Sequence, residues 1–334
     1  MRFGLALPHY DFSFPDGGPV SYERVREFAL SAERLGFHSV WISDHFFLSL
    51  ARYGGGPEPH GSLEPLTTLA ALATETDRVR LGTLVLGAPF RPPGILAKMA
   101  TALDLVSHGR LDLGIGSGWY QDEFRAFGYR FGETGERFGI LEETLEVLKL
   151  LFADGPVDHE GKRFRLRGAY NRPRPVQDPG PPVWVGAKGG PRSLRLAARL
   201  ADGWNTVWRW TIDDYAQRVK AARRICEQEG RDPDTLRLSV GLFTLVGEDG
   251  SDLEARYRAL QRWAPGGSLD GQSLEEFARG ALVGTPEEVL EAAGRFADLG
   301  VEEIIINAAS LPFAVFDPSM LELFSETVIA RASV

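Results

Sequence analysis

The stretch Leu111-Asp112-Leu113-Gly114-Ile115-Gly116-Ser117-Gly118-Trp119 joins an apolar, strand-like run to three glycines at alternate positions. Glycines spaced in this way leave one side of the backbone bare, so a flat or anionic group can press against main-chain N–H groups. The run does not match the dinucleotide-binding pattern, because the residue three positions after Gly116 is Trp119 rather than glycine. Its weight comes from its surroundings, in which strand and helix patterns alternate along the whole chain.

Apolar, strand-like runs alternate with amphipathic, helix-like segments. The expected strands are residues 2–7, 39–43, 79–86, 111–115, 183–185, 203–207, 236–246 and 303–306, and the expected helices are residues 22–35, 65–76, 94–106, 137–152, 193–200, 212–229, 285–299 and 318–331. Several strands are almost wholly apolar, such as Ile304-Ile305-Ile306, as parallel strands buried on both faces should be. Eight such units in about 250 core residues predict an α/β fold, a (β/α)8 TIM barrel.

A doubly wound sheet is the alternative architecture for this alternation of strands and helices. It would need a phosphate-binding fingerprint after the first strand, and Pro8-His9-Tyr10 is not one. The barrel is therefore the favoured fold.

Two segments exceed what a barrel needs. Residues 154–182 are rich in proline and carry a hairpin pattern around His159-Glu160-Gly161-Lys162, and residues 247–282 are polar and partly helical. Loops this long in a compact domain tend to be functional lids or interaction surfaces. We therefore expect a single domain over residues 1–334, with insertions after strands four and seven.

Composition narrows the class of protein. The chain has 334 residues, a net charge of −9 with acidic and basic residues interspersed, and one cysteine, Cys226. This charge pattern argues against nucleic acid as a partner, and the single cysteine excludes an internal disulfide. The apolar run before Pro8 is too short to span a membrane, and no leader-like segment is visible. We expect a cytoplasmic protein with no membrane partner.

Chemistry in such barrels is carried at the carboxyl ends of the strands. Asp44-His45, after the second strand, is the sharpest pair, because histidine exchanges a proton near neutral pH and a carboxylate can fix its tautomer. A helix-capping aspartate followed by a structural histidine is the alternative. A metal is disfavoured, because no histidine or cysteine lies at ligand spacing from the pair. His9, at the end of the first strand, is the other histidine held open for a site.

A second candidate follows the fifth strand. Lys188-Gly189-Gly190-Pro191-Arg192-Ser193 directly precedes a helix. The glycines expose N–H groups, a helix amino terminus favours an anion, and the two basic side chains add positive charge. The alternative is a flexible loop with proline at an early helical position. Phosphate binding is the favoured interpretation, although the loop is not a Walker A motif.

Aromatic residues gather near the predicted strand ends. Core packing explains some of them, and a pocket for a planar ring explains the group better. The set is Trp119, Trp204, Trp208, Trp210, Phe46, Phe47 and Phe90.

These residues together resemble the luciferase-like monooxygenase superfamily. The similarity lies in residues 35–45 (LGFHSVWISDH), 79–86 (VRLGTLVL), 108–119 (HGRLDLGIGSGW), 181–186 (PPVWVG), 197–205 (AARLADGWN) and 283–289 (VGTPEEV). The resemblance implies a (β/α)8 barrel that binds FMN or the deazaflavin F420, and many members are homodimers.

Within that family the chain is most similar to the F420-dependent branch. The resemblance makes His45 a proton relay and Asp44 a cofactor contact. It implies a non-prolyl cis peptide between Leu84 and Val85, behind the cofactor ring. It also places the cofactor phosphate at the loop of Lys188, Gly189, Gly190 and Pro191, which is one residue longer here, and extends the cofactor site to Gly116, Ser117 and Gly118.

One departure bears on the substrate. The sugar-phosphate dehydrogenases of this branch carry a glutamate where this chain has Trp119, and their lysine after strand six has no match, Arg209 being the nearest base. A sugar phosphate is therefore disfavoured. We expect an apolar or aromatic substrate in a pocket that includes His9, Trp119, Trp208, Arg209 and Trp210.

Three functions follow as hypotheses. The first is an F420-dependent oxidoreductase that exchanges a hydride with a small organic substrate. The second is an FMN-dependent monooxygenase that uses O₂ and reduced flavin from a partner reductase. The third is a barrel that binds a cofactor or a phosphorylated metabolite without catalysis.

Overall fold

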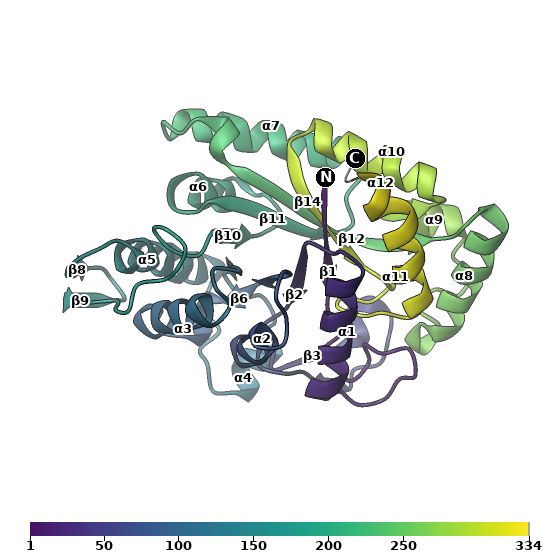
Figure 1. The fold of residues 1–334 in the computed structure, drawn as a ribbon. Helices are drawn as coiled ribbons and strands as arrows, with labels where there is room; N and C mark the ends of the chain where they lie inside the picture. The colour runs from purple at the N-terminus through teal and green to yellow at the C-terminus, as the bar shows by residue number, and fades with distance from the viewer. Residues whose placement is uncertain (333–334) are drawn as a thin grey trace. The chain divides into compact units, whose positions relative to one another are not determined.

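A computed structural model describes residues 1–332 of the chain (Figure 1). It divides into two compact units. Unit 1 comprises Met1–Glu64, Thr206–Lys220 and the chain from Arg237 onward, and unit 2 comprises Pro65–Asn205 and Ala221–Leu236. The single domain expected over residues 1–334 stays a prediction.

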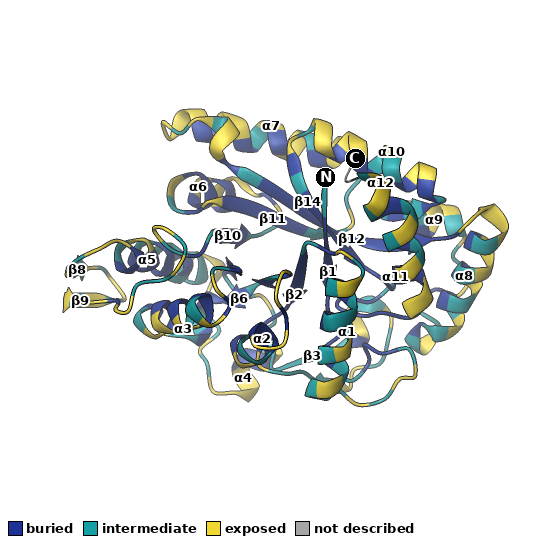
Figure 2. Cartoon of the chain, viewed as in Figure 1, coloured by how far each residue is buried: buried dark blue, intermediate teal, exposed yellow. Residues whose placement is uncertain are grey.

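Unit 1 is built on four parallel strands. Their order is β12 (Arg237–Val246), β14 (Val301–Asn307), β1 (Arg2–Ala6) and β2 (Ser39–Ile42). The register pairs Gly4 with Ile305 on one side and with Ser39 on the other. These strands are buried almost throughout, which is why they are apolar (Figure 2). A short strand, β13 (Leu282–Gly284), adds parallel to the end of β12.

The helices of unit 1 begin at local sequence signals. In α1 (Tyr22–Arg34) the Ser21 side chain accepts from the Arg24 N–H, and Val25, Ala29 and Ala32 form the buried face. A capping box of Thr285 and Glu288 begins α10 (Pro286–Asp298). The last expected helix is present as α11 (Pro318–Phe324), a π-helical segment Ser325–Ile329 and α12 (Ala330–Ala332).

Unit 2 is also built on four parallel strands. Their order is β5 (Arg80–Thr83), β7 (Leu111–Gly116), β10 (Val183–Gly186) and β11 (Gly203–Trp208), and β6 (Leu86–Gly87) also pairs with β7. The helices of this unit are α2 (Pro65–Ala73), α3 (Pro93–Val106), α4 (Gln121–Ala126), α5 (Thr134–Phe152) and α6 (Pro191–Leu200). The chain passes from unit 2 into unit 1 within β11 and returns within α7 (Ile212–Gln228).

The predicted fold class is confirmed. Four parallel strands in each unit, separated along the chain by helices, are the eight strands of a (β/α)8 barrel. Among the described residues, no helix has the length and the apolar composition that crossing a bilayer requires.

The two insertions differ in where they enter the fold. Residues 154–182 contain the expected hairpin, β8 (Val157–Glu160) and β9 (Arg165–Ala169), but they follow helix α5 and lead into the start of β10. This insertion therefore lies at the amino ends of the strands, opposite the carboxyl ends at which a lid over the site would lie. The second insertion follows β12 directly and contains α8 (Gly250–Trp263) and α9 (Leu274–Ala278).

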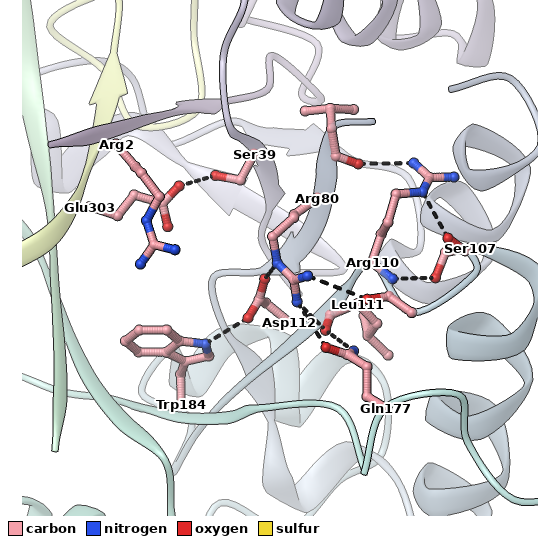
Figure 3. Close-up of polar contacts among 12 residues, drawn as sticks. Arg2, Ser39, Arg80, Ser107, Arg110, Leu111, Asp112, Gln177, Trp184 and Glu303 are labelled. Carbon is pink, nitrogen blue, oxygen red and sulfur yellow. Dashed lines mark hydrogen bonds and ion pairs between the residues drawn. The ribbon is translucent and has the colours of Figure 1, made fainter. Parts of the chain in front are cut away.

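Buried charges at the starts of the strands are paired inside their own unit (Figure 3). In unit 2, Asp112 accepts from Arg80 Nε at 2.5 Å and from Trp184 Nε1 at 3.1 Å. In unit 1, Glu303 accepts from the Ser39 hydroxyl, which in turn accepts from Trp41 Nε1. Buried carboxylates need such partners, so these residues stabilise the non-catalytic ends of the strands.

Candidate functional site

The first two strands of unit 1 bring a buried polar cluster together at their carboxyl ends. His9 and Tyr10 follow β1, and Ser43 follows β2; none of the three is more than 3% exposed. His9 Nδ1 lies 2.9 Å from the Leu7 carbonyl oxygen, and His9 Nε2 lies 3.0 Å from Ser43 Oγ. The Tyr10 hydroxyl lies 2.5 Å from the same Ser43 Oγ. The register that sets Leu5 against Val40 places these residues side by side.

This burial differs from the expected position of His9 in a substrate pocket, because the side chain has no exposed surface. Burial lowers the pKa of His9 to about 3; the hydrogen bond to Leu7 opposes this shift, and the nearby His45 adds to it. His9 is therefore neutral near pH 7.

Asp44 and His45 extend from the same strand end. Asp44 is 4% exposed, and His45 is half-buried with its carbonyl oxygen accepting from the Ser62 hydroxyl. His45 is close enough to His9 for their charges to interact. The structure thus places the expected proton-transfer pair next to the His9–Ser43–Tyr10 cluster.

Three further aromatic side chains continue from His9. The Phe313 ring packs edge-on against His9 at 5.0 Å and against Trp208 at 5.2 Å, and Trp208 stacks on Phe243 at 5.5 Å. Trp208 was expected here, whereas Phe243 and Phe313 were not. Phe243 lies within the apolar strand β12, and Phe313 lies in the loop after β14, so neither carried a distinct sequence signal. The peptide between Val207 and Trp208 is cis, which the sequence did not indicate.

Asn307, at the end of β14, holds Phe313 in place. Its Oδ1 accepts from the Phe313 N–H at 2.5 Å, and its Nδ2 donates to the carbonyl oxygens of Ala309 and Leu311. Phe313 has a φ of 53°, a left-handed conformation that a bulky residue rarely adopts without such support. Asn307 therefore organises the loop after β14.

Arg209 and Trp210 are held by their own unit. The Arg209 guanidinium donates to the carbonyl oxygens of Phe277 at 2.7 Å and Arg279 at 3.2 Å. Trp210 Nε1 donates to Thr206 Oγ1 at 3.1 Å. These bonds use one nitrogen of the Arg209 guanidinium and the Trp210 indole N–H, and the contribution of both residues to a substrate pocket stays a prediction.

In unit 2, the peptide between Leu84 and Val85 is cis, as the resemblance implied. The Val85 side chain lies against three glycines. A Cβ added at Gly116 would lie 2.8 Å from Val85 Cγ2, and one at Gly186 would lie 2.5 Å from Val85 Cγ1. At Gly114 the added Cβ would lie 2.1 Å from the Thr83 carbonyl oxygen.

These contacts give the glycine run a packing reason. The space that a side chain at Gly114 or Gly116 would occupy is filled by Val85 and the β5 backbone, and contact of the run with a cofactor stays a prediction. Gly118 has a φ of 73°, and a Cβ there would lie 2.7 Å from the Phe124 ring. The glycines are thus required by packing and by backbone conformation.

Within the glycine run, Ser117 is half-buried. Directly after the run, Trp119 is 42% exposed, and its ring is tilted against Tyr120 with the ring centres 5.3 Å apart. Trp119 is one of the few large apolar side chains exposed among the described residues. Single exposed apolar side chains are common on protein surfaces, so the place of Trp119 in the substrate pocket stays a prediction.

The loop after β10 leads directly into a helix start. Helix α6 begins at Pro191 with Gly190 as its N-cap, and no side chain caps it. Lys188 and Gly190 are exposed, Gly189 has a φ of 73°, and no atom lies within 4 Å of a Cβ added at Gly190. The amino terminus of a helix favours an anion, so phosphate binding at this loop stays a prediction. The Arg192 guanidinium instead donates to the Gly135 carbonyl oxygen and lies over the Phe138 ring, toward α5.

Comparison with known proteins places the chain in a family. The model of the luciferase-like monooxygenases matches residues 1–303. An F420-dependent glucose-6-phosphate dehydrogenase of Microbacterium testaceum is 30% identical over 99% of this chain and 97% of its own length. An F420-dependent hydroxymycolic acid dehydrogenase of Mycobacterium tuberculosis is 31% identical over 94% of this chain and 82% of its own length.

A solved structure agrees with these matches. The crystal structure of a monooxygenase from Streptomyces bottropensis superposes with a TM-score of 0.76 and 28% identity, over 99% of this chain and all of that one. Matches of this extent in sequence and in structure lead to one conclusion: the chain belongs to the luciferase-like monooxygenase family.

Proposed function

We propose that this protein is an F420-dependent oxidoreductase that transfers a hydride between the deazaflavin and a small organic substrate. One observation carries the proposal: Asp44-His45 lies at the carboxyl end of β2 in a chain whose full-length relatives are named F420-dependent dehydrogenases. A histidine at that end of a barrel strand suits proton transfer coupled to a hydride step.

The proposed roles of the individual residues follow the family resemblance. In unit 1, His45 moves the proton and Asp44 contacts the cofactor. In unit 2, the Leu84–Val85 peptide, Gly116, Ser117 and Gly118 lie against the cofactor, and the loop of Lys188, Gly189, Gly190 and Pro191 binds its phosphate. The open space beside Gly190 and the uncapped start of α6 fit a phosphate. When bound, F420 supplies a two-electron hydride carrier, and the protein supplies orientation and electrostatics.

We propose an apolar or aromatic substrate rather than a sugar phosphate. No lysine matches the one that the sugar-phosphate dehydrogenases use, and Arg209, the nearest base, directs its Nη1 to two carbonyl oxygens. Trp119 and Trp208 supply partly exposed aromatic surface at two strand ends. The relative from Microbacterium testaceum is named for glucose-6-phosphate, which makes that compound the contrasting probe.

The second candidate is an FMN-dependent monooxygenase. The Streptomyces bottropensis structure carries a monooxygenase name, which supports this alternative. It predicts O₂ consumption with reduced FMN and a dependence on a flavin reductase. We also propose a cytoplasmic location and a homodimer.

The test begins with two separate titrations of the purified protein, one with oxidised F420 and one with FMN. Quenching of tryptophan fluorescence reports the binding in each titration. Micromolar binding of F420 with weak FMN binding is the expected result. A preference for FMN would favour the monooxygenase, and binding of neither would remove the assigned chemistry.

Kinetics then test His45. We expect His45→Ala to lower kcat roughly 100-fold with little change in F420 affinity, because the side chain acts in proton transfer rather than in binding. His159→Ala, in the hairpin β8–β9, is the matched control. Equal rates for His45→Ala and wild type would remove His45 as the relay.

A further inference from the structure

The cluster of His9, Tyr10 and Ser43 has a definite hydrogen-bond direction. The Leu7 carbonyl oxygen only accepts, so His9 Nδ1 carries the proton and Nε2 is the acceptor. Ser43 then donates to Nε2 from its hydroxyl at 3.0 Å and from its main-chain N–H at 3.3 Å. Since the Ser43 proton points to His9, its oxygen accepts from the Tyr10 hydroxyl at 2.5 Å.

This chain of bonds holds the residue next to the proposed relay. Ser43 directly precedes Asp44-His45, and both its hydroxyl and its N–H are bound to one imidazole nitrogen. That nitrogen is fixed in turn, because the His9 ring packs against Tyr10 at 4.4 Å and against Phe313 at 5.0 Å. The end of β2 is therefore held by side chains from β1 and from the loop after β14.

The buried polar groups of this cluster lie at the carboxyl ends of the strands, directly before Asp44-His45. Tyr10 and His9 have no exposed surface, and Ser43 is 3% exposed. Burying a hydroxyl or an imidazole costs free energy unless every bond is made, so apolar side chains would serve packing at lower cost. What the network adds is a single orientation for the segment that follows it.

We propose that Tyr10 and His9 are positioning residues that act through Ser43 to orient Asp44-His45. This inference rests on the proposed function, in which His45 moves the proton. It assigns His9 a role behind the site instead of one in the substrate pocket.

The charge state of His9 agrees with this role. Burial keeps His9 neutral near pH 7, so it adds no positive charge to the strand end. The Nε2 lone pair therefore stays available near pH 7 to accept the hydrogen bonds from Ser43.

The experiment compares single hydroxyl deletions. Tyr10→Phe removes the first donor and keeps the ring contacts with Phe12 and Phe313. Ser43→Ala breaks the connection to His9, and Ser43→Thr restores the hydroxyl. Tyr257→Phe is the matched control, because the Tyr257 side chain is equally buried and its hydroxyl donates to the Gln272 carbonyl oxygen.

We expect Tyr10→Phe and Ser43→Ala to lower kcat with F420 about 10-fold at unchanged KM and F420 affinity, since misplacement of a catalytic group acts on the chemical step. Ser43→Thr recovers most of the rate, and Tyr257→Phe stays within twofold of wild type.

A second readout needs no cofactor. In ¹H–¹⁵N spectra of the imidazole groups, Tyr10→Phe and Ser43→Ala shift the His45 signals of the free protein, whereas Tyr257→Phe does not. Urea unfolding shows whether each variant folds. If Ser43→Ala does not fold, the comparison of Tyr10→Phe and Ser43→Thr with wild type still tests the proposal.

Two failures are distinguishable. If His45→Ala is slow but Tyr10→Phe matches Tyr257→Phe in rate and in His45 signals, the positioning role is wrong and the proposed function stands. If His45→Ala equals wild type, the proposed function fails first.

Discussion

Val85 explains why glycine stands at two positions of β7 and at a third position in β10. Its two methyl groups occupy the space beside Gly114, Gly116 and Gly186. In a close-packed interior, even one added methyl group forces its neighbours to shift, so glycine at these positions serves packing.

A substitution at Gly114 tests this packing. We expect Gly114→Ala to lower the free energy of unfolding by about 1–3 kcal/mol, because the new Cβ meets the Thr83 backbone rather than a flexible side chain. Gly94→Ala is the control: Gly94 lies in the first turn of α3 with no atom within 4 Å of an added Cβ, so stability should stay equal or rise by up to about 1 kcal/mol. Urea denaturation gives both values, and equal stability of the two variants would contradict the packing role.

His9 makes a prediction about pH. Its folded-state pKa of about 3 lies below the ordinary value of 6.5, so the unfolded chain binds a proton that the folded protein does not. The contribution of His9 is complete above pH 6.5 and is lost as the pH falls toward 3, with a slope of up to about 1.4 kcal/mol per pH unit. The stability advantage of wild type over His9→Gln should therefore shrink between pH 7 and pH 5 in urea titrations; a constant advantage would show that His9 is not buried neutral.

At the scale of elements, one carboxylate joins the hairpin β8–β9 to helix α5. Glu143, on α5, accepts from the N–H groups of Arg163 and Phe164 and from the Arg163 guanidinium at 2.9 Å. Burial alone would raise the pKa of Glu143, but these hydrogen bonds outweigh it and lower the pKa. The hairpin therefore depends on an ionised Glu143.

This dependence can be measured with Glu143→Gln. A lowered folded-state pKa means that the stabilisation is complete above the ordinary value of 4.5 and is lost as the pH falls below it. We expect the variant to be about 1–3 kcal/mol less stable at pH 7 and the difference to narrow below about pH 4. Glu142→Gln is the control, because Glu142 makes a partly exposed ion pair with Arg199. Equal effects of the two variants would contradict a special role of Glu143.

At the scale of the molecule, we predict that the protein forms a homodimer. The expectation rests on the family, in which many members are homodimers. Analytical ultracentrifugation should give about twice the 36.8 kDa of one chain at micromolar concentration. A mass of one chain over the full concentration range would overturn the prediction.

Much of the fold could be predicted because its signals are local. Several barrel strands are largely apolar runs, and helix starts such as Ser21 and Thr285 carry their own capping residues. The short strands β3 (Phe47–Ser49) and β4 (Pro59–Gly61) had no such run and were missed. The π-helical turn at Ser325–Ile329 was also missed, because its sequence suits an ordinary helix.

The sequence by itself determined the order of eight strands and helices, the family, and Asp44-His45 at a strand end. Only the tertiary structure decided which side chains pack against these residues and which groups they bond. Val85 fills the space that Gly116 leaves open, and Ser43, 34 positions from His9, binds its imidazole. The physical reason is register: hydrogen bonding that sets Leu5 between Ile306 and Val40 brings distant side chains together, and no local pattern encodes that pairing.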